Sequence, residues 1–328
     1  MPSASTQELL NQAWFGLIGL MLMLYVVTDG FDLGLGILTL LRRKEHDRDL
    51  MIQSIGHVWD ANETWLVALG GALFGAFPSA YAMILTDLYV PVMVMIASFI
   101  MRGAAIEFRH AAHSSKTVWD RVFGIGSLLA AISQGIVLGK VLTGFVPGLS
   151  SLGFVAVTAI GVVSGYCLLG ATWVVKKTTG AIQSSARREA TAAAFATVVA
   201  ALIVSLATFE VSPVGVTRWH EHAVFSLLIA LAVFAALAFV YVLYSIHMRG
   251  ESGPFIGSTL LFVISFAGLA VSLFPYIVPG KLTIDAAASD SPTLAFMLLG
   301  IGMVFPIMIG YNLYQYHLFR GKVVPVKH

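Results

Sequence analysis

Long continuous runs of apolar residues, separated by short polar connections, make up most of this 328-residue chain. A helix that crosses a bilayer needs about 20 consecutive apolar residues. Nine runs of that kind lie near residues 13–38, 59–77, 81–101, 122–146, 154–175, 190–211, 224–246, 256–279 and 293–317. Because they are continuous and do not alternate with a period of two, they indicate helices rather than the strands of a membrane barrel.

The second run has the weakest pattern, because it opens with the polar stretch WDANETW and contains Gly70, Gly71 and Gly75. A re-entrant segment there would change the number of spans. No run of polar residues is long enough for a water-soluble domain, so the sequence predicts a single transmembrane domain over residues 1–328.

Basic residues fall on one side of these nine predicted spans. That side holds Arg42, Arg43, Lys44, Arg48, Arg102, Arg109, Lys116, Arg121, Lys176, Lys177, Arg187, Arg188, Arg249, Arg320, Lys322 and Lys327. The other side has only Arg218 and Lys281, with Lys140 inside the fourth span towards it. Since cytoplasmic loops carry an excess of Lys and Arg, the amino terminus is predicted outside and the carboxyl terminus in the cytoplasm.

Composition supports a membrane protein and argues against several other classes. Only 11% of the residues are charged and 58% are hydrophobic, whereas a soluble domain has about a quarter charged residues. The net charge of +2 is too small to indicate nucleic acid as a partner. Cys167 is the single cysteine, and the nine histidines fall at predicted helix ends or in loops. A haem or metal site built by this chain alone is therefore not expected.

Five carboxylates gather near the predicted cytoplasmic face. Asp29 and Asp32 lie in the first span, Asp60 and Glu63 open the second, and Glu107 follows the third. Each of the first two pairs has i, i+3 spacing and so shares one face of its helix. An ionisable group within a span costs about 2.5–3.5 kcal/mol on insertion scales, which makes these residues candidates for function.

Two interpretations of these acids remain open from the residue types. In the structural one, Asp29, Asp32, Asp60 and Glu63 pair with Arg42, Arg102 or Arg109 and lock helix ends together. In the functional one, burial lets carboxyl groups hold and pass protons near neutral pH, so that the acids form a proton route.

Three stretches near the amino terminus resemble the signature stretches of subunit II of the cytochrome bd-type quinol oxidases. They are TDGFDLGLGIL, then SIGHVWDANETWL followed by GGALFGAFPSAYA, and finally YVPVMVMIASFIMRGAAIEFRH, with PYIVP near Pro275 as a supporting match. The short chain is most similar to the cyanide-insensitive branch of that family.

The resemblance implies an all-α fold of two four-helix bundles plus one peripheral helix, in the bacterial cytoplasmic membrane. It implies a partner, subunit I, that holds two b haems and one d haem and oxidises quinol, so that this chain ligates no cofactor. The complex would reduce oxygen to water and separate charge without a proton pump. A quinone bound to this chain, a small single-span accessory subunit and bound membrane lipid are compatible with the resemblance.

The resemblance also assigns roles by position. Asp60 matches the acid of a WDGN-type motif, in which Asn62 is kept and Ala61 replaces glycine. Glu107 matches an acid in an FEFR-type stretch and Asp29 the first acid of TDGFD, so the implied proton path contains Asp60, Glu107 and Asp29, with Glu63 and Asp32 beside them. Structural, lipid or quinone contacts are expected from Trp59, Trp65, Arg102 and Arg109.

Two other functions fit the same residues. A proton-coupled secondary transporter would place acids at the membrane midplane, related by an internal repeat, and the sequence shows no repeat. A purely structural partner subunit would use the acids for packing alone.

Overall fold

The computed structural model describes residues 4–112, 115–213 and 218–323, and most of them are helical. The helices that precede residue 113 are α1 (Ala4–Thr39), α2 (Glu45–Gln53), α3 (Trp59–Ala76), α4 (Pro78–Asp87) and α5 (Tyr89–Ala111). The middle of the chain forms α6 (Lys116–Leu142), α7 (Leu149–Lys177) and α8 (Gly180–Val211). The last part forms α10 (His222–His247), α11 (Gly253–Leu273), β1 (Tyr276–Val278), β2 (Leu282–Thr283), α12 (Ile284–Ala287) and α13 (Ser291–Leu318).

The prediction of an all-helical membrane protein is confirmed. Within the described ranges, eight helices are long and apolar enough to cross a membrane. That number becomes nine if α3 and α4, which are bent by 118° at their junction, form one span. The number of spans therefore depends on whether the weak second run, with α3 and α4, forms one span.

Two predicted boundaries are wrong, and a proline explains each. The third run was expected to begin at residue 81, but residues 78–87 form the separate helix α4 and the long helix starts at Tyr89. Pro78 opens α4 because it lacks the N–H that would continue α3. The eighth run was expected to reach residue 279, but α11 ends at Leu273, just before Pro275, and the chain continues as β1.

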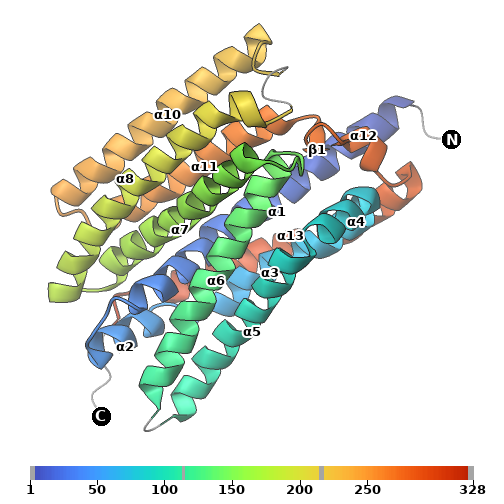
Figure 1. Cartoon of the computed structure of the whole chain (residues 1–328). Coiled ribbons are helices and arrows are strands. Elements are labelled where there is room, and N and C mark those ends of the chain that lie inside the picture. The colour runs from blue at the N-terminus through green and yellow to red at the C-terminus, as the bar shows by residue number, and fades with distance from the viewer. Residues whose placement is uncertain (1–3, 113–114, 214–217, 324–328) are drawn as a thin grey trace.

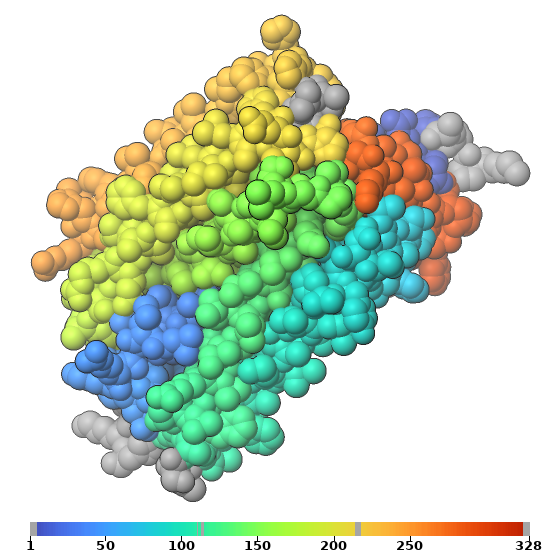
Figure 2. Space-filling model, in the orientation of Figure 1, coloured from blue at the N-terminus to red at the C-terminus, as the bar shows by residue number. Residues whose placement is uncertain are grey.

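The helices α1, α6 and α7 pack against one another at the centre of the molecule (Figure 1). On one side α5 packs on α6, and α3 packs on α1 with α13 against both. On the other side α8 packs on α7, and the paired helices α10 and α11 complete the flank. Figure 2 shows these two flanks as the yellow and the green-to-cyan surfaces.

Glycines let α1 and α7 approach until their backbones touch. A Cβ at Gly34 of α1 would overlap the carbonyl oxygen of Tyr166, and a Cβ at Gly170 of α7 would overlap the backbone nitrogen of Leu35. Without a hydrophobic driving force between helices in lipid, such close packing is a principal source of their association. This contact fixes the depth of α1 and of the acids that it carries.

The two ends of the molecule are different. One end, here called the α2 end, contains α2 and the last residues of α13, whereas the opposite end, the β1 end, contains β1 and the start of α1 (Figure 1). At the β1 end Asn11 donates to Asp285 (2.8 Å) and the indole of Trp14 donates to the carbonyl of Leu294 (3.0 Å). These bonds tie the start of α1 to α12 and α13.

Candidate functional site

A buried ion pair joins α1 to α5. Asp29 and Arg102 are both fully buried, and the guanidinium of Arg102 donates to the Asp29 carboxylate. The second oxygen of Asp29, and the Nε and Nη1 of Arg102, have no hydrogen-bond partner among the described residues. Of the pairings expected from sequence, this is the one that the structure forms with a predicted site acid.

Asp32 lies at the end of a hydrogen-bonded chain that crosses three helices. Asn62 of α3 donates its side-chain amide to Asp32 (2.8 Å), and the hydroxyl of Tyr316 on α13 donates to the carbonyl oxygen of Asn62 (2.6 Å). Both Asp32 and Asn62 are fully buried. Nothing in the sequence pointed to Tyr316, because an aromatic residue in an apolar run is ordinarily a packing residue. The contact depends on tertiary structure.

Three of the predicted acids lie towards the surface of the chain. Asp60 and Glu107 are exposed and Glu63 is half-buried, and no ion pair to any of them is formed within the described ranges. The ring of Trp59 lies 3.6 Å from the point where Gly103 would carry a Cβ, so the start of α3 touches α5. Gly103 and Glu107 are i, i+4 and share a face of α5. The exposed acids therefore gather where α3 and α5 meet.

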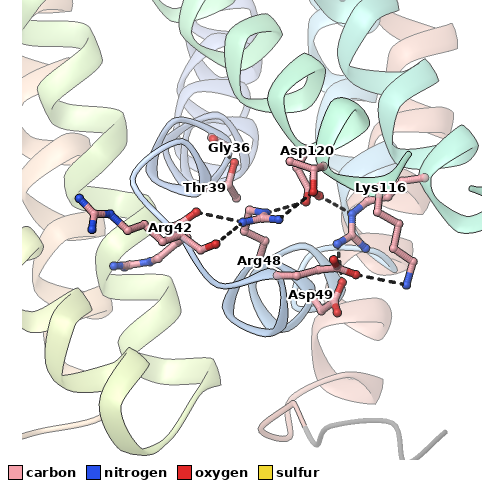
Figure 3. Close-up of polar contacts among 11 residues, drawn as sticks. Gly36, Thr39, Arg42, Arg48, Asp49, Lys116 and Asp120 are labelled. Atoms are coloured by element: carbon pink, nitrogen blue, oxygen red, sulfur yellow. Dashed lines mark hydrogen bonds and ion pairs between the residues drawn. The ribbon is translucent and has the colours of Figure 1, made fainter. Parts of the chain in front are cut away.

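Arg109 and Arg42, the two other expected arginines, pair with acids outside the predicted five, and Arg109 does so together with Arg48. Arg109 donates to Asp120 (2.5 Å) and to Asp49, and Arg48 donates to the other oxygen of Asp120 (2.6 Å) (Figure 3). Arg48 also donates to the carbonyls of Arg42 and Arg43. This inner network ties α2, α5 and α6 together at the α2 end. Residues of three different helices supply it, so local spacing carried no sign of it.

Arg42 binds Glu189 of α8 through both terminal nitrogens, at 2.6 and 2.5 Å, instead of one of the predicted acids. A bidentate pair of this kind fixes orientation as well as distance. The connection after α1 is therefore attached to the second flank of the molecule.

Asp120→Asn should weaken the inner network. One carboxylate accepts from two nearly buried guanidinium groups, and an amide oxygen can replace only part of that charge-assisted bonding. We expect a loss of about 2 kcal/mol in stability, seen as a lower unfolding temperature of the purified complex in detergent.

Glu45→Gln is the matched control on α2. Its carboxylate lies 3.9 Å from Lys116 and is half-exposed, so the pair is worth between about 0 and 1 kcal/mol. Equal unfolding temperatures for the two variants would contradict a structural role for Asp120.

Trp59 and Trp65, the two tryptophans expected to make contacts, differ in exposure. Trp65 is only 1% exposed and packs edge-on against Phe305 of α13, with ring centroids 5.4 Å apart, so its contacts lie inside the chain. Trp59 is half-buried beside Gly103, at the edge of the exposed acids. Trp65 thus holds α13 against α3, whereas Trp59 remains available to a molecule bound outside.

One turn from Asp29 towards the β1 end, a second polar chain joins the three central helices. Gln134 of α6 donates to the hydroxyl of Tyr25 (2.8 Å), and the hydroxyl of Tyr166 on α7 donates to Gln134 (2.5 Å). Tyr25 and Asp29 are i, i+4 on α1. The acids on α1 thus continue as a polar stripe along a buried helix face.

None of the histidine side chains that the structure describes is buried. Those histidines whose side chains are described lie at helix ends or in connections, including His57 before α3, His247 at the end of α10 and His317 near the end of α13. Within the described ranges, no three His, Cys, Asp or Glu residues are arranged to hold a metal ion.

Comparison with known proteins identifies the family. The sequence pattern of the family described as cytochrome bd terminal oxidase subunit II matches residues 10–319. This chain belongs to that family. The prediction made from the three amino-terminal stretches is confirmed, and the chain is a multi-pass membrane subunit of an oxidoreductase complex.

Relatives in the subunit II family match over nearly their whole length. "Cytochrome bd ubiquinol oxidase subunit 2" of Bacillus subtilis is 28% identical over 340 residues, which cover 96% of this chain and 97% of that protein. "Cytochrome bd-I ubiquinol oxidase subunit 2" of Escherichia coli K12 is 26% identical over 366 residues, with 96% of each chain covered. A chain of the bd oxidase from Geobacillus thermodenitrificans shares the fold, with a TM-score of 0.76, 19% identity, and 94% and 98% of the two chains covered.

Proposed function

We propose that this subunit II pairs with a haem-bearing subunit I in a quinol:oxygen oxidoreductase and supplies a proton path from the cytoplasm for the reduction of oxygen to water. The observation that carries the proposal is the group of unpaired acids at the junction of α3 and α5. Asp60 and Glu107 are exposed on helices whose other surface is largely apolar. The haems of the complex would carry electrons to oxygen outside this chain.

The proposal follows from the cost of placing those acids against lipid. An acid at the centre of a span costs about 2.5–3.5 kcal/mol, and part of that cost applies to Asp60 and Glu107 near the ends of α3 and α5. Neither acid is neutralised by a described cation. A protein partner or water must therefore cover the junction of α3 and α5. A partner of the same oxidase, subunit I, meets that need and gives protons a destination.

The proposed route begins at the cytoplasmic end of α5, near Arg109. Protons pass Glu107 and Asp60, with the buried acids Asp29 and Asp32 beside the route, and cross at the junction of α3 and α5 to subunit I. Glu63 is half-buried and shares a helix face with Asp60, so it bridges the exposed and the buried acids. Arg109 is engaged by the inner network and shapes the entrance instead of carrying protons.

The orientation proposed for the chain places the α2 end in the cytoplasm. Described residues at this end include Arg42, Arg48, Lys177, Arg187 and Lys322, as expected for a cytoplasmic face.

We further propose nine spans, with α3 crossing the membrane and α4 lying along its outer surface. One bundle would contain α1, α3, α5 and α6, the other α7, α8, α10 and α11, and α13 would be the peripheral helix. The location would be the bacterial cytoplasmic membrane.

Asp60→Asn tests the route. The amide has nearly the same shape and cannot release a proton, so quinol oxidation by the assembled complex should fall at least about tenfold. The measurement is oxygen consumption per haem in membranes, with the optical spectrum as a check that the complex assembles.

Asp87→Asn is the matched control, because Asp87 lies at the opposite end of the molecule, 3.9 Å from Lys281 and partly exposed. It should turn over normally. A normal rate in assembled Asp60→Asn complex would remove Asp60 from the route, and loss of the haem spectrum would favour a packing role.

A second candidate, a subunit that only stabilises subunit I, is favoured by the complete burial of the pair Asp29 and Arg102. Such a pair can serve the fold alone. Amide substitution of all five acids without loss of rate in the assembled complex would support this candidate over the proton path.

A further inference from the structure

The buried carboxyl group of Asp32 accepts a hydrogen bond from the side-chain amide of Asn62, and only one orientation of that amide allows the bond. Asp32 is 0% exposed, one of its oxygens accepts from Asn62, and the other has no partner in the part of the chain that the structure describes. An asparagine side chain has a donating and an accepting end of almost equal size. If it turned over, its carbonyl oxygen would face the carboxyl oxygen of Asp32, and the hydrogen bond would be lost.

The carboxylate of Asp32 and the hydroxyl of Tyr316 together set that amide. An ionised carboxylate only accepts hydrogen bonds, so the NH2 end of Asn62 faces Asp32. The hydroxyl of Tyr316 donates to the carbonyl oxygen of Asn62 at 2.6 Å and holds the amide in that orientation. Because Asn62 is fully buried, water does not compete for either end, and the bond is stronger than it would be in solvent.

The position of Tyr316 does not depend on its own hydroxyl. Lys177 donates to the backbone carbonyls of Phe319 and Gly321, just beyond the end of α13, and the ring of His57 stacks on Phe319 with centroids 4.3 Å apart. The tyrosine ring also lies against Trp173, at a centroid distance of 6.1 Å. Removal of the hydroxyl alone should therefore leave α13 in place.

An ion pair beyond α13 adds to this attachment. Lys322 donates to Glu251 in the connection between α10 and α11, and that hydrogen bond holds the pKa of Glu251 below its ordinary value. The backbone of Val323 donates to the carbonyl of Lys177 (2.9 Å). Both contacts involve residues after the last turn of the helix.

We infer that Tyr316 and Asn62 are positioning residues that hold the Asp32 carboxyl group in the orientation from which it exchanges protons. The inference rests on the proposed function, because it is the proposed function that places Asp32 beside the proton route. Asn62 does not transfer a proton itself, because an amide is not an acid or a base near neutral pH. Through Tyr316, α13 at the margin of the bundle helps to orient the carboxyl group of Asp32 on α1.

Tyr316→Phe is the test, because it removes one oxygen atom and keeps the ring. Quinol oxidation by the assembled complex should fall about fivefold, the effect of losing one ordinary hydrogen bond. Tyr314→Phe on the same helix is the control. Its side chain is 62% exposed, and its rate should equal that of the parent complex.

A double-mutant cycle with Asn62→Leu separates positioning from packing. If Tyr316 acts through Asn62, Tyr316→Phe should add almost nothing to the rate loss of Asn62→Leu. Infrared difference spectra of the oxidised and reduced complex give a second readout. The carboxyl band that disappears in Asp32→Asn should shift in Tyr316→Phe and stay unchanged in Tyr314→Phe.

An unchanged rate in Tyr316→Phe, with an unshifted Asp32 band or no such band, would overturn the inference, as would rate losses that multiply in the double variant. Failure of the proposed route has a different signature. Normal turnover of Asp32→Asn would take Asp32 off the route, whereas a band shift in Tyr316→Phe would still support the hydrogen-bonded chain.

Discussion

Arg102→Leu should destabilise the subunit by about 3–5 kcal/mol and remove most of it from assembled complex. The substitution leaves Asp29 fully buried without its cation, and breaking one side of a buried pair exposes the whole cost of the remaining charge. Asp32 is also fully buried on α1, so the loss of Arg102 leaves two buried acids close together without its positive charge. The measurement is the amount of haem-containing complex recovered from membranes, together with its unfolding temperature.

The double variant Asp29→Asn with Arg102→Leu shows whether the loss comes from the pair. Because both charges are removed, it should recover part of the stability that Arg102→Leu alone loses. Arg43→Leu, at an exposed position after α1, is the control and should change little. If the single and double variants unfold at the same temperature, Asp29 and Arg102 are not energetically coupled.

Gly34→Ala should cost at least about 3 kcal/mol, although it adds only one methyl group. The new Cβ would overlap the carbonyl oxygen of Tyr166, a backbone atom that cannot turn aside as a side chain could. The helices α1 and α7 would have to separate along their contact, which would also shift the acids on α1. The yield and the unfolding temperature of the complex measure this effect.

Gly16→Ala on the same helix is the control for helix propensity. Nothing lies within 4 Å of the position of its Cβ, so it should be neutral or slightly stabilising. Gly170→Ala changes the same contact from the side of α7 and should resemble Gly34→Ala. Equal stability of Gly34→Ala and Gly16→Ala would show that α1 and α7 tolerate separation.

The helical fold followed from the apolar runs because lipid requires each backbone polar group to be bonded within its own helix. Hydropathy carries little information on where a helix bends. The break at Phe77 and the end of α11 before Pro275 depend on single residues inside apolar runs. A window of about 20 residues averages over such residues, and the two boundary errors lie at those points.

The sequence could select the acids of the candidate site, but it could not predict their partners. The cost of charge in lipid singled out the acids of α1, α3 and α5, and the spacing within α1 placed Asp29 and Asp32 on one face. Which cation each acid would meet depends on the contacts between helices. Arg102 joins Asp29, whereas Arg109 joins Asp120, and the link from Asn62 to Tyr316 spans 254 positions of sequence.

The length of α1 offers a practical way to test orientation. Its 36 residues extend about 54 Å, whereas the hydrocarbon of a bilayer is about 30 Å thick. A straight α1 is therefore much longer than the lipid is thick. At the β1 end, Gln7 and Asn11 bond to each other, to the carbonyl of Ser289 and to Asp285 of α12. A reporter enzyme fused ahead of α1 would stand about 37 Å from Asp29 along the helix, and its activity would tell which compartment that end faces without disturbing the acids.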